Sequence, residues 1–195
     1  CEQGKVYEGT TYFGFFGKEA LTNQIGMPTA KVPYLSAEQK AIAESGRLPH
    51  DPPFPGPKMR MVDRIDGYLP TGGRAGLGLV QGSVTVDPSF WFFAAHFYQD
   101  PVWPGSLGLE SFLQLLKFAA WKRWGDAEWQ TVGLNVAHEW VYRGQVVPRD
   151  REVIVVLEVT AVDESAKRLT ADGFLTVDGR VIYQMIGFTL EVAAR

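Results

Sequence analysis

The amino-acid sequence predicts an α+β fold, in which a curved antiparallel sheet wraps around one long buried helix. The helix is predicted over residues 106–123, where apolar side chains occupy most of the helical circumference rather than one stripe. The sheet is predicted from three long strand patterns joined by short polar turns, at 152–162, 168–177 and 181–192. Turns this short join neighbouring antiparallel strands, and a sheet curved around the helix would bury all of its sides.

Composition indicates a globular protein and excludes several functions. Of the 195 residues, 46% are hydrophobic and 13% aromatic, so the chain can bury a core as one domain, or as one domain with an extension. A net charge of −3 without a basic block gives no reason to expect nucleic-acid binding, and the apolar runs are too short to span a membrane. Because Cys1 is the only cysteine and no signal peptide is visible, we expect a reducing, cytoplasmic compartment.

Residues 1–53 are predicted to form an N-terminal extension, and residues 54–195 the main domain. The boundary is placed in the stretch 50–57, HDPPFPGP, because its four prolines are typical of a linker. An alternative is that the first part simply wraps the main domain. Since the chain starts with Cys1 rather than Met, we expect either a segment cut from a longer polypeptide or trimmed numbering.

Local patterns predict further elements. In the extension, the aromatic run 7–16 suits an irregular strand, and residues 18–24 suit a short helix. Ser36 to Gln39 matches a capping box, which predicts a helix to about Ser45 with Gly46 as its stop. In the main domain, additional strands are predicted at 59–65, 75–86, 131–138 and 142–147.

The candidate chemistry lies between residues 90 and 124. An almost wholly apolar, strand-like run at 90–95 leads to His96, and a tight turn through Asp100-Pro101 and Pro104-Gly105 leads to the long helix. Proline suits a helix entrance because it has no N–H to leave unpaired, and glycine lets another group approach the backbone.

Within the helix, the polar residues Ser106, Glu110, Gln114 and Lys117 fall on one line. Glu110 therefore lies about one turn inside an apolar helix, where an unpartnered carboxylate is costly and tends to be neutralised. Together with His96 and the free N–H groups of the helix N-terminus, Glu110 completes a possible set of general base, general acid and oxyanion donor.

Several motifs follow one another between residues 54 and 193. They are Pro57-x-Met59-x-Met61-Val62-Asp63-Arg64, Trp91-Phe92-Phe93, His96-Phe97, Asp100-Pro101-Val102-x-Pro104-Gly105, Leu107-Gly108-Leu109-Glu110 with Gln114, and Val177-Asp178-Gly179-Arg180-x-Ile182-Tyr183. These residues resemble the 3-hydroxyacyl-(acyl-carrier-protein) dehydratase family. The similarity is greatest to the 3-hydroxydecanoyl branch and to the dehydratase domains of polyunsaturated fatty acid and polyketide synthases.

The resemblance implies a hot-dog fold, an antiparallel sheet wrapped around the central helix, working as a homodimer or a tandem pseudo-dimer. In this family the histidine of one hot dog works with the acid of the neighbouring one. The decanoyl branch usually has aspartate at the position of Glu110 and often cysteine at Ser106, whereas the sister branch of simple 3-hydroxyacyl dehydratases has glutamate. Acyl chain length and trans-2/cis-3 isomerase activity therefore do not follow from the resemblance.

The resemblance also implies the reaction. A 3-hydroxyacyl thioester on the phosphopantetheine arm of an acyl carrier protein would lose water to give a trans-2-enoyl thioester, without a metal or redox cofactor. His96 would remove the Cα proton while the Val102 carbonyl fixes its tautomer, and Glu110 would protonate the departing hydroxyl. The Gly105 N–H would hold the thioester oxygen, and Gln114 would orient Glu110. The predicted substrate-binding residues are Phe93, Trp103, Pro104 and Ser106.

Two other functions stay open. A hot-dog thioesterase would share the fold but use an acid to activate water, without the pair His96 and Glu110. A non-catalytic hot-dog half would complete a neighbour's dimer in a megasynthase and bind carrier protein without turnover. A Ser-His-Glu hydrolase built on Ser106 is disfavoured because no Gly-x-Ser-x-Gly elbow is present. His50 and His138 lack acidic or cysteine neighbours at ligand spacing, so no metal site is predicted.

Each candidate also has a purely structural interpretation. His96 could be a satisfied core histidine, and Glu110 a buried acid capped by the helix N-terminus. Gln114 could be a core glutamine bonded to the backbone. The basic pair Lys167 and Arg168, in a predicted hairpin turn, could simply be solvated or could dock an acidic carrier protein.

Overall fold

The computed structural model describes residues 4–5, 7–14, 17, 19, 23–125, 128–129, 133 and 136–193. The helical elements are α2 (Ala37–Ile42), the short 3-10 helix η1 (Pro57–Met59), α3 (Trp91–Ala95) and α4 (Gly105–Trp124). The strands are β1 (Glu44–Arg47), β2 (Arg64–Leu69), β3 (Leu79–Thr85), β4 (Glu128–Trp129), β5 (Glu139–Tyr142), β6 (Glu152–Asp163), β7 (Arg168–Val177) and β8 (Arg180–Ala193).

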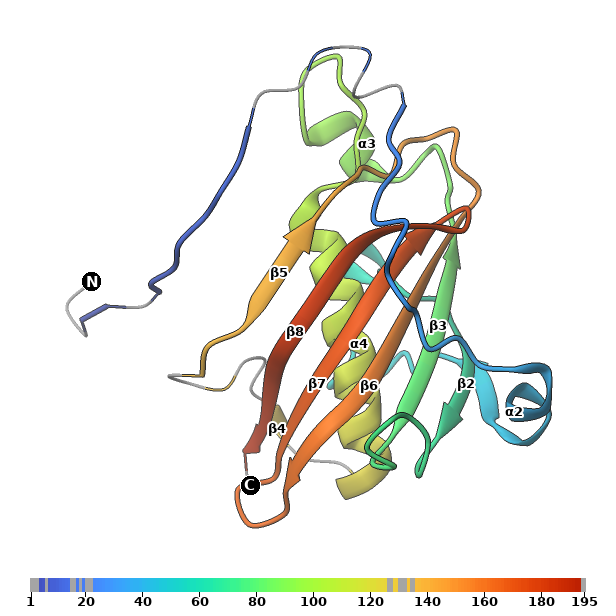
Figure 1. Cartoon of the computed structure of the whole chain (residues 1–195), viewed down its shortest axis with the longest axis vertical. Helices are drawn as coiled ribbons and strands as arrows, with labels where there is room; N and C mark the ends of the chain where they lie inside the picture. The colour runs from blue at the N-terminus through green and yellow to red at the C-terminus, as the bar shows by residue number, and fades with distance from the viewer. Residues whose placement is uncertain are drawn as a thin grey trace.

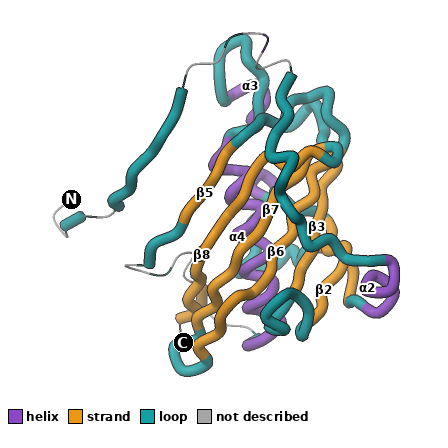
Figure 2. The backbone as a smooth tube through the Cα atoms, in the orientation of Figure 1, coloured by secondary structure: helices purple, strands orange, loops and turns teal. Residues whose placement is uncertain are grey.

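A curved antiparallel sheet wraps around α4 (Figure 1). Its strands follow the order β1-β2-β3-β6-β7-β8-β4, and β5 also pairs with β8. The helix α4 contacts β3, β6, β7 and β8, so it fills the inside of the curve. Figure 2 shows α3 at one end of the sheet and α2 beside β2. The predicted α+β hot-dog arrangement is confirmed.

The central helix α4 matches its predicted span of 106–123 within one residue at each end. It ends where Gly125 adopts a φ of 73° and donates its N–H to the Trp121 carbonyl. Most of the side chains between Leu107 and Ala120 are buried, which confirms that the helix is covered on most sides.

The sheet approaches α4 so closely at Gly108 that no side chain fits there. An ideal Cβ on Gly108 would lie 2.2 Å from Cε2 of Tyr183 on β8. Tyr183 is 1% exposed, so its ring has little space into which it can move. Glycine at this position is therefore what lets the helix seat against β8.

We expect Gly108→Ala to lower the free energy of unfolding by up to about 2 kcal/mol. Alanine gains about 1 kcal/mol of helix propensity over glycine, whereas a methyl group forced into a packed core typically costs about 1–3 kcal/mol. The packing cost prevails because the Tyr183 ring is enclosed. Urea unfolding measures the difference, with Gly46→Ala as control, because a Cβ on Gly46 meets no atom within 4 Å. Equal stability of the Gly108 variant and the wild type would contradict this packing.

The three long predicted strands are confirmed as β6, β7 and β8, each within one residue of its expected ends. The hairpin between β7 and β8 turns at Asp178 and Gly179, whose φ angles are 47° and 80°. A two-residue hairpin needs this left-handed conformation at both positions, which asparagine, aspartate and glycine tolerate best.

The strand predicted at 59–65 is wrong over most of its length, because β2 starts only at Arg64. The N–H groups of Met61 and Val62 donate to Oε1 of Gln114, at 2.9 and 3.2 Å. A side chain of α4 thus takes the hydrogen bonds that a neighbouring strand would otherwise accept.

The strand predicted at 75–86 is too long at its start, because β3 begins at Leu79. The chain before it turns back on itself, with the Gly78 N–H donating to the Gly72 carbonyl. The two short strands β1 and β4 were not predicted, and both obtain their pairing from a longer neighbour.

The strands predicted at 131–138 and 142–147 do not match β5, which covers 139–142. Beyond β5, the Gln145 N–H donates to the side chain of Gln24 rather than to a strand. Gly133 and residues 136–138 are not in strands, and the rest of the predicted segment 131–138 lies outside the described residues.

The apolar run 90–95 forms the helix α3, so the strand-like interpretation is wrong. The His96 N–H donates to the Phe92 carbonyl, which is a helical hydrogen bond. Phe92 and Phe93 are both buried while Trp91 is exposed. Two adjacent buried side chains suit one face of a helix, whereas a half-buried strand would alternate.

The capping box at Ser36 is confirmed, because Ser36 and Gln39 exchange hydrogen bonds of 2.9 and 3.2 Å. The helix α2 nevertheless ends at Ile42, earlier than expected, and Gly46 lies in β1 rather than at a helix end. Pairing of β1 with β2 draws the chain into the sheet. This strand precedes the domain boundary placed at residue 53, which stays a prediction.

The segment 23–35 crosses the outer face of the sheet from β8 to β3 (Figure 1). At one end the Met27 N–H donates to the Val181 carbonyl, and at the other the Leu35 N–H donates to Oε1 of Gln81. Further upstream, residues 7–14 form no strand. Most of the helix predicted at 18–24 lies outside the described residues.

Candidate active site

His96 lies at the C-terminal end of α3, half-buried, with its ring stacked on Phe97 at a centroid distance of 4.0 Å. Its ring nitrogen Nδ1 lies 3.1 Å from the Val102 carbonyl oxygen. Because a carbonyl oxygen only accepts, Nδ1 carries the hydrogen, and Nε2 of the neutral ring keeps its lone pair. This is the tautomer that a general base with a free Nε2 requires.

The turn between His96 and α4 is anchored to the loop that follows β5. The Trp103 N–H donates to the Val146 carbonyl at 2.9 Å. The Trp103 indole packs on Phe92, with ring centroids 4.7 Å apart, and both Val102 and Trp103 are buried. The Val102 carbonyl is therefore held rigidly toward the histidine.

The helix α4 begins with N–H groups that have no hydrogen-bond partner among the described residues. The Pro104 carbonyl accepts the N–H groups of Leu107 and Gly108, and no side chain caps the helix. Among the described residues, none accepts a hydrogen bond from the N–H of Gly105 or Ser106. Unpaired N–H groups at the positive end of a helix dipole favour a negatively charged oxygen.

Gln114 is fully buried and uses both ends of its amide. Its Oε1 accepts the N–H groups of Met61 and Val62, and its Nε2 donates to the Met59 carbonyl at 2.8 Å. The same Nε2 lies 3.0 Å from Oε1 of Glu110. Gln114 therefore ties the loop before β2 to α4 and orients the Glu110 carboxyl group.

Glu110 is half-buried in the single chain, although the sequence predicts it to be buried. On the same line of α4, Ser106 is exposed and Lys117 is half-buried, whereas Gln114 lies beneath the loop before β2. The sheet covers the other sides of the helix. The loop before β2 covers Gln114 but does not enclose Glu110, one helical turn earlier. We call this partly exposed side of α4 at Glu110 the open flank.

We expect Gln114→Leu to lower the free energy of unfolding by about 2–4 kcal/mol. The buried N–H groups of Met61 and Val62 would lose their partner, and each buried unsatisfied group costs about 1–3 kcal/mol. Lys117→Leu serves as control, because the described residues include no hydrogen-bond or ion-pair partner of Lys117. Its effect should stay within about 0.5 kcal/mol. Urea unfolding compares the two variants, and equal small losses would show that the Gln114 bonds contribute little.

The structure brings the predicted residues together as two pairs. His96 pairs with Val102, and Glu110 pairs with Gln114. No hydrogen bond or ion pair between described residues links one pair to the other within the chain. Within the chain, the two pairs therefore form separate hydrogen-bonded units.

The four predicted substrate-binding residues differ in their surroundings. Phe93 and Trp103 are buried and contact each other, with ring centroids 6.4 Å apart. Pro104 is half-buried and Ser106 is exposed at the first turn of α4. Contact of these side chains with a substrate stays a prediction.

Three aromatic side chains that the sequence analysis did not assign to the site lie at the start of α4. A Cβ on Gly105 would lie 3.2 Å from Cη2 of Trp140 and 3.3 Å from Cε2 of Tyr142, both on β5. Tyr183 of β8 packs against Tyr142 with ring centroids 4.8 Å apart. The alternation of Trp140 and Tyr142 is a signal for one face of a strand, but the predicted strand boundaries separate the two residues.

Comparison with models of protein families assigns the chain to a family. The model of the FabA-like domain matches residues 54–186. The chain belongs to the FabA-like family. The matched region contains His96, Val102, Gly105 and Glu110, together with the whole of α4. The predicted resemblance to dehydratase hot-dog domains is thereby confirmed at the level of the family.

One relative of this FabA-like chain is a subunit of a fatty acid synthase. The chain is 29% identical, over 219 aligned residues, to a subunit of the polyunsaturated fatty acid synthase of Thraustochytrium sp. (strain ATCC 26185 / S-3). The alignment covers 96% of this chain, which spans 14% of the length of that protein.

Solved structures show the same fold. The dehydratase heterocomplex ApeI:P of Xenorhabdus doucetiae matches with a TM-score of 0.50 and 14% identity, over 83% of this chain and 93% of that chain. A hypothetical thioesterase protein of Streptococcus pneumoniae TIGR4 gives a TM-score of 0.44 and 13% identity, over 67% of this chain and 89% of that chain. At such identities, the similarity to ApeI:P indicates a shared fold and no more.

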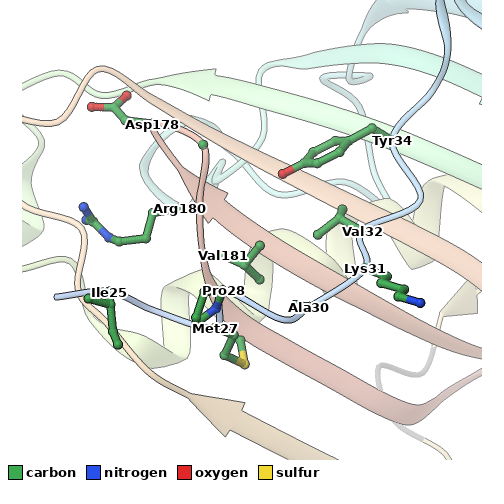
Figure 3. A pocket seen from close by; sticks show the side chains of 11 residues that line it. Ile25, Met27, Pro28, Ala30, Lys31, Val32, Tyr34, Asp178, Arg180 and Val181 are labelled. Carbon is green, nitrogen blue, oxygen red and sulfur yellow. The ribbon is translucent and has the colours of Figure 1, made fainter.

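A separate pocket of about 650 Å³ lies between the segment 25–34 and the β7–β8 hairpin of the FabA-like chain (Figure 3). None of the predicted site residues lines it, and its basic residues Lys31 and Arg180 point away from each other.

In the described part of the chain, no three His, Cys, Asp or Glu side chains gather in a way that could hold a metal ion. No helix of that part is long and apolar enough to cross a membrane. The start of α4 therefore stays the candidate site.

Proposed function

We propose that this FabA-like chain dehydrates 3-hydroxyacyl thioesters to trans-2-enoyl thioesters in fatty acid or polyketide synthesis. The acyl group would be carried on the phosphopantetheine arm of an acyl carrier protein, with no further cofactor. The observation that carries the proposal is the 3.1 Å contact between His96 Nδ1 and the Val102 carbonyl, beside the unpaired N–H groups that begin α4. Membership of the family supports this reaction class, since these residues lie in the matched region.

His96 starts the reaction in this proposal. Its free Nε2 removes a proton from Cα of the substrate, and the Val102 carbonyl stabilises the imidazolium that forms. The electron pair from the broken C–H bond moves toward the thioester carbonyl. The developing oxyanion accepts a hydrogen bond from the Gly105 N–H at the positive end of α4.

Glu110 completes the reaction as the general acid. It transfers a proton to the hydroxyl group on Cβ, which leaves as water while the double bond between Cα and Cβ forms. In this proposal Glu110 takes up a proton again before each turnover, and its side chain is half-buried in the single chain. We propose that a second hot dog covers it, in a homodimer or a tandem pseudo-dimer, and presents its own histidine there.

An acyl carrier protein is the proposed partner. The similarity to part of a polyunsaturated fatty acid synthase supports a synthase setting, although this chain spans 14% of that relative. The hairpin pair Lys167 and Arg168 is a weak candidate for carrier docking. Arg168 is already paired with Glu191, and Asp163 and Glu164 in the same turn offset the two positive charges.

A mass-spectrometric assay tests the proposal, with 3-hydroxyacyl thioesters of several chain lengths as substrates and the molecular mass in solution measured alongside. We expect loss of water to a trans-2-enoyl thioester, and a cis-3 product would add isomerase activity. Release of free thiol instead would identify a thioesterase. Binding of carrier protein without any turnover would identify a non-catalytic half. Either of these last two outcomes would overturn the proposal.

A further inference from the structure

Three aromatic rings form a wall beside the first turn of α4. Tyr142 lies directly opposite Tyr183 in the pairing of β5 with β8. Trp140 packs edge-on against both, with centroid distances of 6.0 Å to Tyr142 and 5.6 Å to Tyr183. Figure 1 shows β5 alongside the N-terminal half of α4, so the wall stands next to the proposed site of the thioester oxygen.

The two tyrosines contact successive turns of one helix face. The Tyr142 ring lies 3.3 Å from the position of a Cβ on Gly105, and the Tyr183 hydroxyl lies 3.0 Å from that of a Cβ on Gly108. The phenol of Tyr142 is therefore beside the residue whose N–H begins α4. Glycine at both helix positions leaves space that the two rings occupy.

The rings of Tyr142 and Tyr183 pack with centroids 4.8 Å apart, and each hydroxyl group affects the pKa of the other. Tyr183 is 1% exposed, whereas Tyr142 is 37% exposed. A buried hydroxyl proton without an acceptor is costly, so we expect the Tyr183 hydroxyl to donate to the neighbouring Tyr142 hydroxyl. Two hydroxyl groups carry two protons and this bond uses one of them, so the Tyr142 proton is free to point away from Tyr183.

Both phenols stay protonated near neutral pH. Burial raises the pKa of Tyr183 well above its ordinary value, and the neighbouring Tyr142 raises it further. Burial also raises the pKa of Tyr142. The neighbouring Tyr183 hydroxyl lowers it in part, and the negative charge of Asp100, in the turn between His96 and α4, raises it. Tyr142 is therefore a permanent neutral donor rather than a base.

We infer that the Tyr142 hydroxyl donates a second hydrogen bond to the thioester carbonyl oxygen, alongside the Gly105 N–H. This inference rests on the proposed dehydration, because it assigns a second donor to the same oxyanion. A donor that is already oriented by Tyr183 stabilises the enolate as its charge develops, without reorganisation during the reaction. Phenylalanine would fill the same space beside Gly105 but would leave the oxyanion with one donor.

Tyr142→Phe tests the inference through hydration of a crotonyl thioester. We expect kcat to fall about 100-fold, at the lower end of the range for loss of one oxyanion donor, with a smaller change in KM. Tyr68→Phe is the control, because Tyr68 also packs on α4, against Phe118 toward the other end of the helix. It should leave turnover unchanged.

A double variant separates catalysis from packing. If the Tyr142 hydroxyl served only to satisfy Tyr183, its removal would have no effect on turnover once Tyr183→Phe had removed that need. We expect the loss of kcat from Tyr142→Phe to persist in the Tyr183→Phe background. Melting temperatures of all variants are measured in parallel to show that each is folded.

The carbonyl stretching frequency of a 13C-labelled enoyl thioester gives a readout that does not depend on turnover. Bound to His96→Ala, the ligand should show a shift to lower frequency that becomes smaller when Tyr142→Phe is added. A normal kcat in Tyr142→Phe, or a carbonyl frequency that Tyr142→Phe does not change, would overturn the inference. Turnover by the wild type would still leave the proposed function standing. Absence of turnover in the wild type would overturn both.

Discussion

His96→Ala is expected to reduce hydration of crotonyl thioesters by about 10³- to 10⁴-fold, which is the largest effect predicted for this chain. The variant loses the only described side chain whose basic nitrogen is oriented by the Val102 carbonyl at the start of α4. The remaining N–H donors can still polarise the thioester, but nothing accepts the Cα proton. Steady-state kinetics followed by mass spectrometry measure the loss.

Two further histidine variants make this result specific. His96→Asn keeps a side-chain N–H that can donate to the Val102 carbonyl but has no basic nitrogen, so we expect the same loss with the turn intact. His50→Ala is the control, because His50 is exposed before η1, and its turnover should equal that of the wild type. Near-normal turnover of His96→Ala would end the dehydratase proposal.

Glu110→Gln is expected to reduce turnover by about 10²- to 10³-fold, because it removes the proton donor to the departing hydroxyl. Glutamine keeps the length of the side chain and an oxygen that accepts from Gln114 Nε2, so the packing of α4 is preserved. Glu110→Asp keeps the acid but shortens its reach by one methylene, and we expect it to retain more activity than glutamine. Equal activity of the wild type and Glu110→Gln would exclude Glu110 as the acid.

Mixing His96→Ala with Glu110→Gln shows whether the two residues act across copies. If they do, each mixed dimer has one intact site, and random mixing restores about a quarter of the wild-type sites. If they act within one chain, both partners stay inactive and mixing restores nothing. We expect restoration, because the proposed function has the histidine of one hot dog work with the acid of another.

Features that depend on neighbours in the sequence could be predicted well. The ends of α4 follow from Pro104 before it and Gly125 after it, and its burial follows from apolar residues around its circumference. The spacing between His96 and Glu110 could also be predicted, because only a short turn and the first turn of α4 separate them in the sequence. The hairpin at Asp178 and Gly179 needs only the conformational tolerance of its two residues.

Other features could not be predicted because they depend on segments that meet only after folding. Residues 61–62 have a strand-like sequence, but Gln114, more than fifty positions away, accepts their N–H groups. The run before His96 has a strong strand composition, yet its contacts with Trp103 favour a helix. Local propensity is worth tenths of a kcal/mol per residue, whereas burial of one aromatic side chain is worth about 1.5–3 kcal/mol.

The sequence by itself determined that a histidine precedes one buried helix and that an acid lies within this helix. Turn chemistry and helical periodicity depend on residues only a few positions apart. The tertiary structure alone decided which atoms surround that helix. It placed the Tyr142 and Tyr183 pair against Gly105 and Gly108, and it left Glu110 at an open flank. The physical reason is that strand register and the coverage of a surface are set by packing between distant segments, which no local pattern encodes.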